Sequence, residues 1–79
     1  MERVKLIWDF RGPNAGPIAQ HHCIHLREFV QAENLEDTFC EVEKQTEMHH
    51  IAYMVVPRVH MQDLRERLKP NRGQLYQES

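Results

Sequence analysis

The stretch MHHIAYMVV, residues 48–56, decides the fold of this chain, because it predicts a strand that is apolar on both faces. Such a strand is buried on both faces, or buried on one and paired with a partner on the other. A second apolar strand is predicted at residues 3–10, RVKLIWDF, where alternate residues share one apolar face. That face carries Val4, Leu6, Trp8 and Phe10. We expect these two strands at the centre of one sheet.

Between the two apolar strands the sequence predicts a loop, a helix and a third strand. The loop is RGPNAGP at 11–17, and the helix follows at 17–33. The apolar arc of that helix holds Ile18, Ala19, Cys23, Leu26, Phe29 and Val30. Residues 38–44 alternate and carry glutamates, which is typical of an edge strand, and residues 44–47 are the predicted hairpin turn.

After Pro57 the sequence predicts a second helix at 58–69, and it leaves open whether 74–77 form a short last strand. The order β-α-β-β-α, with or without a final β, predicts an α+β domain of the ferredoxin-like, split βαβ type. This fold has an antiparallel sheet in the order 4-1-3-2, with two helices on one face. The length predicts a single domain over 1–79.

The sheet face without helices is predicted to stay apolar. It would carry Ile7 with Ile51, Tyr53 and Val55, or instead Met48, Ala52 and Met54. An exposed apolar face on a small protein favours self-association, so we expect a homodimer through the open sheet face.

Composition narrows the possible partners and compartment. Ten Lys and Arg stand against twelve Asp and Glu, giving a net charge of −2, so binding to nucleic acid by bulk charge is not expected. The longest apolar run, 51–56, is too short to span a membrane, and the start of the chain lacks a signal peptide pattern. We therefore expect a cytoplasmic protein with Cys23 and Cys40 reduced.

Six histidines are the main chemical clue in the sequence. His21 and His25 lie four residues apart in the predicted helix and share a side, and Glu28 follows one turn later. Imidazole and carboxylate together suit zinc, nickel or copper. The sequence therefore predicts a metal site at His21, His25 and Glu28, although such a pair can equally be a solvated helix flank.

A ligand pocket is predicted at the same end of the domain, lined by Trp8, Asp9, His22 and His50. His22 falls in the apolar arc of the helix, and His49 and His50 point to opposite sheet faces. His22 or His50 could act as a general base, with Asp9 orienting it by accepting its N–H. His22 could instead be a core histidine with one hydrogen bond.

The segments KLIWDFRGP at 5–13, HHCIHL at 21–26 and EF at 28–29 resemble a group of small uncharacterised bacterial proteins. The layout is also similar to small dimeric α+β barrel proteins. Some of these are cofactor-independent monooxygenases or haem-degrading enzymes, and others only bind ligands. The resemblance implies a dimeric ferredoxin-like domain and carries over no activity.

Three functions stay open at this point. The first is a homo-oligomeric binding or sensor domain whose histidine-rich end holds a metal ion or a small ligand. The second is a small oxygenase-type enzyme of the dimeric α+β barrel class. The third is a protein-interaction module with incidental histidines.

Overall fold

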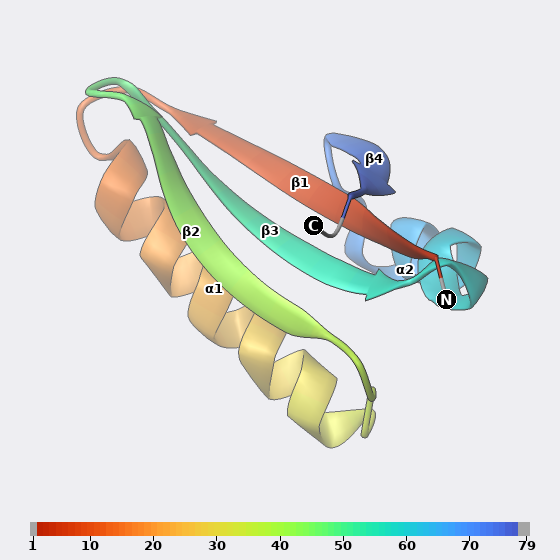
Figure 1. Ribbon diagram of the computed structural model, residues 1–79. Coiled ribbons are helices and arrows are strands. Elements are labelled where there is room, and N and C mark those ends of the chain that lie inside the picture. The colour runs from red at the N-terminus through yellow and green to blue at the C-terminus, as the bar shows by residue number, and fades with distance from the viewer. Residues whose placement is uncertain (1, 78–79) are drawn as a thin grey trace.

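The computed structural model describes residues 2–77 as one four-stranded antiparallel sheet with helices, an α+β arrangement (Figure 1). The elements are β1 (Arg3–Arg11), α1 (Ala15–Ala32), β2 (Phe39–Thr46), β3 (His49–Pro57), a 3₁₀ turn (Arg58–His60), α2 (Met61–Leu68) and β4 (Arg72–Tyr76). The strands lie in the order β2-β3-β1-β4. Within the described residues no helix is long and apolar enough to cross a membrane.

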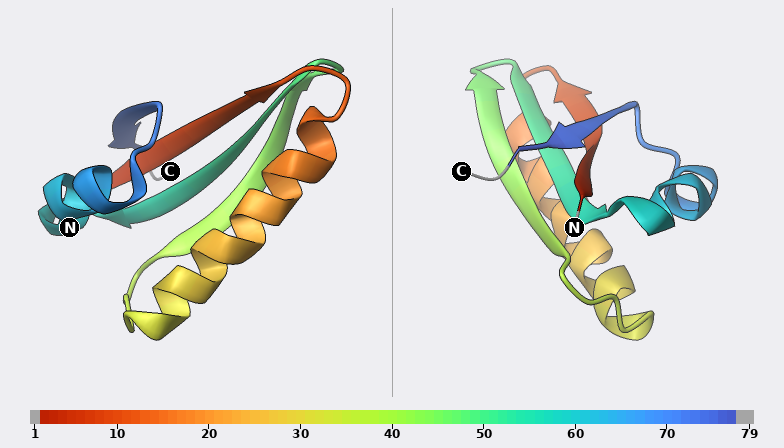
Figure 2. Two further views of the ribbon diagram at one scale, coloured as in Figure 1. Left: turned by 180° about the vertical axis from the view of Figure 1, so that it is seen from behind. Right: turned by 45° about the vertical axis from the view of Figure 1, so that its right-hand side comes forward.

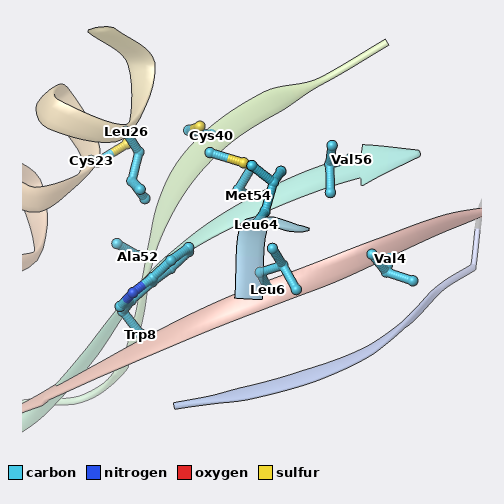
Figure 3. Close-up of a cluster of buried hydrophobic side chains, with 10 residues drawn as sticks. All are labelled: Val4, Leu6, Trp8, Cys23, Leu26, Cys40, Ala52, Met54, Val56 and Leu64. Atoms are coloured by element: carbon cyan, nitrogen blue, oxygen red, sulfur yellow. The ribbon is translucent and has the colours of Figure 1, made fainter. Parts of the chain in front are cut away.

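The two apolar strands form the centre of the sheet, as the sequence predicts. β1 and β3 pair along their whole length, from Arg3 opposite Pro57 to Arg11 opposite His49. Their helix-side residues make the core, which Figure 3 shows in close-up. That core holds Val4, Leu6, Trp8, Ala52, Met54 and Val56, all at most 5% exposed.

Both helices contribute side chains to this core, but they cover different parts of the sheet. α1 runs diagonally under β2 and β3 (Figures 1 and 2), where its buried Cys23 and Leu26 join the cluster. α2 is short and lies beside the start of β1, at the end of the domain away from the hairpin between β2 and β3. Leu64 from α2 enters the same cluster, and the Trp8 Nε1–H donates to the Leu68 carbonyl at 3.1 Å.

Several element boundaries differ from the sequence-based expectations. The last strand forms at Arg72–Tyr76, two residues earlier than the segment left open. The hairpin turn is shorter and later than predicted, at residues 47–48, and follows an irregularity between Lys44 and Thr46. α2 begins only at Met61, because the first residues after Pro57 form a 3₁₀ turn.

The expectation of an exposed apolar sheet face is wrong. Ile7, Ile51 and Val55 lie on the face away from the helices, yet each is at most 2% exposed in the single chain. On the same face, the Lys5 ammonium lies 4.2 Å from the Tyr53 ring centre.

The two edges of the sheet also meet across the open face. The Arg3 guanidinium lies over both the Phe39 ring of β2 and the Tyr76 ring of β4, at 5.5 and 5.4 Å. These two rings are themselves 5.9 Å apart and nearly perpendicular. Aliphatic stems and aromatic rings thus form a thin second layer over the open face, which the alternation pattern does not reveal.

Candidate functional site

His21 and His25 of α1 face each other on the outside of the domain. Their Nε2 atoms are 3.0 Å apart and their ring centres 4.6 Å apart. The helix causes this approach, because residues four apart are neighbours on its surface. The His25 Nδ1 lies 3.3 Å from a Glu28 carboxylate oxygen, and the side chains of His25 and Glu28 are 61% and 68% exposed. The predicted convergence of the two imidazoles is therefore confirmed.

An Nε2–Nε2 separation of 3.0 Å is that of a hydrogen bond, in which one ring N–H donates to the other ring nitrogen, and both nitrogens could bind one cation only after the rings turn toward it. With metal–nitrogen bonds of about 2.05 Å, nitrogens 3.0 Å apart subtend about 95° at the ion. That angle suits neighbouring positions of a square-planar or octahedral ion such as copper(II) or nickel(II). Tetrahedral zinc would need the nitrogens to separate to about 3.3 Å.

Glu28 does not complete the predicted set of three ligands. It binds His25 through Nδ1, on the opposite side of the ring from the Nε2 that faces His21. No group of three or more His, Cys, Asp or Glu residues within 2–77 is arranged to hold a metal ion. Glu28 can instead fix the His25 ring and its tautomer, as carboxylates behind ligating histidines do.

His22 is half-buried where α1 packs on the sheet. Its ring lies 5.1 Å from the Trp8 ring and 5.4 Å from the Phe10 ring, and its buried Nε2 has no hydrogen-bond partner among residues 2–77. Burial lowers the pKa of His22, and charge on His25 and His21 would lower it further. The contacts with two aromatic rings agree with the structural interpretation of His22, but the hydrogen bond that this interpretation included is not found at Nε2 within the described residues.

Asp9 is held in a cluster of charged side chains on the open face. The His49 Nε2 lies 2.7 Å from its carboxylate, and Arg72 donates to both carboxylate oxygens at 3.0 Å. The Asn71 side chain accepts the backbone N–H of Asp9. The Arg72 hydrogen bond is the main reason that the pKa of Asp9 falls to about 2. Asp9 and His49 are each about one-sixth exposed, so the pair is shielded from water.

The predicted pocket of Trp8, Asp9, His22 and His50 does not form as one site. Successive strand residues alternate, so Asp9 lies on the opposite sheet face from Trp8 and Phe10. His50, opposite Phe10 in register, packs on the helix side against Gly16. Asp9 therefore orients His49 in place of His22 or His50. Four hollows on the described surface are bordered by none of the four predicted pocket residues.

Sequence reasoning missed His49 and Arg72 as partners of Asp9. The signal for His49 was the alternation itself, which places Asp9 and one of the two adjacent histidines on the same face. Arg72 carried no signal, because it lies in a strand whose pairing was left open.

Comparisons of this chain with models of protein families, with curated protein sequences and with solved structures find no match.

Proposed function

We propose that this domain binds one transition-metal ion through His21 and His25, as a small binding or sensor domain. The observation that supports this most directly is the 3.0 Å separation of the two Nε2 atoms. The other ring nitrogen of His25, Nδ1, lies 3.3 Å from the Glu28 carboxylate. Two imidazole nitrogens this close on one helix need only small side-chain rotations to bind the same ion, which favours chelation. An angle of about 95° favours copper(II) and nickel(II), and a separation wider by about 0.3 Å would suit zinc, so all three ions are candidates.

Calorimetric titration of tag-free protein with copper(II), nickel(II) and zinc tests this proposal. We expect saturable binding that weakens markedly between about pH 7.5 and pH 5, because only neutral imidazole binds a metal. His21→Ala and His25→Ala should each abolish chelation. Glu28→Gln should weaken metal binding about tenfold, because the carboxylate that contacts His25 Nδ1 is lost while both imidazole donors remain.

His60→Ala is the matched control, because it removes a histidine at the other end of the domain. This variant should bind metal like the native protein. Binding that survives in His21→Ala and His25→Ala, or that disappears equally in His60→Ala, would refute the assignment.

The Asp9–His49 pair supports a second candidate, the oxygenase-type enzyme of the dimeric α+β barrel class. A carboxylate 2.7 Å from an imidazole fixes one tautomer and leaves the other ring nitrogen able to take a proton. In this version of the hypothesis His49 replaces His22 and His50 as the base. Haemin titration provides the test: a shift of the haem absorption band that His49→Ala removes would support it, and an unchanged spectrum would count against its haem-dependent form.

We also propose that the domain is ferredoxin-like, of the split βαβ type, and related to the small bacterial proteins it resembles. The β-α-β-β-α-β order and the central pairing of β1 with β3 support this assignment. Self-association is part of the same proposal. Because the apolar residues of the open sheet face are buried within one chain, another copy would use a different surface.

A further inference from the structure

The outward side of α1 carries few charges. We call the residues on this side the outer strip: Pro17, Ile18, His21, Ile24, His25, Glu28 and Ala32. Ile18, which the sequence pattern assigns to the inward apolar arc, is 50% exposed, because the buried side of α1 is formed by Ala15, Ala19, Cys23 and Leu26. Ile24 is 54% exposed, and Glu28 is the one residue of the strip with a permanent charge. Solvent-facing helix sides normally carry many charged residues, whereas the centres of protein interfaces are depleted in them.

In the proposed metal site, the histidine pair in the middle of this strip would form only part of the ligand set. One chain supplies two nitrogen donors, and no third donor from 2–77 is placed to join them. Square-planar and tetrahedral ions take four ligands. A second copy related by a two-fold axis through the ion would supply the other two nitrogens, giving four imidazoles around one ion.

Charge and shape are consistent with this partner. Four neutral imidazoles leave the two positive charges of the ion unbalanced, and one Glu28 carboxylate from each copy would balance them. Pro17 and Ala32, toward the two ends of the strip, are short and uncharged, so they add neither bulk nor charge to the contact. Ile18 and Ile24 flank the histidines and would exclude water from the site.

We infer that a second copy of this chain docks on the outer strip of α1, with His21 and His25 of both copies sharing one metal ion. This inference rests on the proposed metal binding and goes beyond it in naming the partner and the complete ligand set. The interface is isologous, since each copy uses the same strip. The open sheet face takes no part in it.

Sedimentation of tag-free protein with nickel(II) or copper(II), combined with elemental analysis, tests the inference. We expect one ion per two chains and a doubling of the 9.5 kDa mass, both reversed by EDTA. The double variant Ile18→Lys with Ile24→Lys keeps both donors, adds no carboxylate ligand and places charges on the strip. It should stay monomeric and bind its ion at least tenfold more weakly. Val59→Glu, at an 83% exposed apolar residue elsewhere, should behave like the native chain.

The outcomes separate the two proposals. One ion per monomer would overturn the shared site and leave the proposed metal binding intact. No bound ion at all would overturn both. A dimer that persists in EDTA and in the double variant would place self-association on another face, such as the open sheet face, and would also overturn the inference.

Discussion

Replacing Asp9 with Asn should cost about 2 kcal/mol of stability at neutral pH. In the folded chain the pKa of Asp9 falls from its ordinary 3.8 to about 2, chiefly because of the Arg72 hydrogen bond. At about 1.4 kcal/mol for each pH unit, that difference corresponds to roughly 2 kcal/mol. The Asp9 side chain is 17% exposed, so water screens the interaction only partly. For a chain of this length the loss corresponds to a fall in Tm of about 8–16 °C.

The pH dependence gives the sharper test. A carboxyl with a lowered pKa in the folded state stabilises the fold above its ordinary pKa, and this contribution disappears as pH falls toward about 2. Native protein and Asp9→Asn should therefore differ by about 2 kcal/mol at pH 7 and converge toward pH 2. Urea unfolding followed by fluorescence measures both, because Trp8 is the one tryptophan and is 5% exposed.

Glu66→Gln is the matched control, since it neutralises an exposed carboxylate on α2. It should change stability by less than about 0.5 kcal/mol at either pH. Arg72→Gln should reproduce most of the Asp9→Asn loss, and the double variant should be little worse than either single one. A loss of equal size at pH 7 and pH 2, or fully additive losses in the double variant, would refute the assigned pairing.

Three further outcomes concern the core and a helix end. Leu64→Ala should lower the free energy of unfolding by about 2–5 kcal/mol in urea titrations, because this 2% exposed side chain is the one fully buried contribution of α2. Lys69→Gly should raise Tm by a few degrees, because Lys69 ends α2 in the left-handed region at φ 50°, which glycine adopts without strain. Cys23 and Cys40 should react with a thiol reagent only as the chain unfolds, since burial raises both pKa values, that of Cys40 to about 12. Rapid reaction of the native protein would contradict their burial.

The parts of the fold that depend on local patterns could be predicted from the sequence. Alternation located the two central strands, and the apolar arc at Cys23 and Leu26 located the inner side of α1. The facing of His21 and His25 was predictable for the same reason, because an i, i+4 relation exists within a single helix. The ring nitrogen that Glu28 binds depends on rotamers, which spacing does not determine.

Features that depend on pairing between distant segments could not be predicted in this way. Asp9 meets His49 because of the register between β1 and β3, which are joined only through a helix and another strand. Arg72 reaches Asp9 only because β4 pairs with β1. The burial of Ile7, Ile51 and Val55 goes with contacts between the two edges of the sheet, where Arg3 lies over both Phe39 and Tyr76. Alternation of polar and apolar residues within one strand carries no information on such contacts.

The pairing of the first strand with the last has a mechanical consequence. Arg3 lies opposite Tyr76 in antiparallel strands, so both ends of the described chain leave the sheet at the same end of this ladder. A force that pulls these two ends apart would break the β1–β4 backbone pairs one after another, beginning at Arg3 and Tyr76. It would not load all the pairs at the same time. The five-residue β4 would detach first, removing Tyr76 from Arg3 and Arg72 from Asp9. Mild stretching would thus uncover part of the open sheet face while β1 and β3 stay paired.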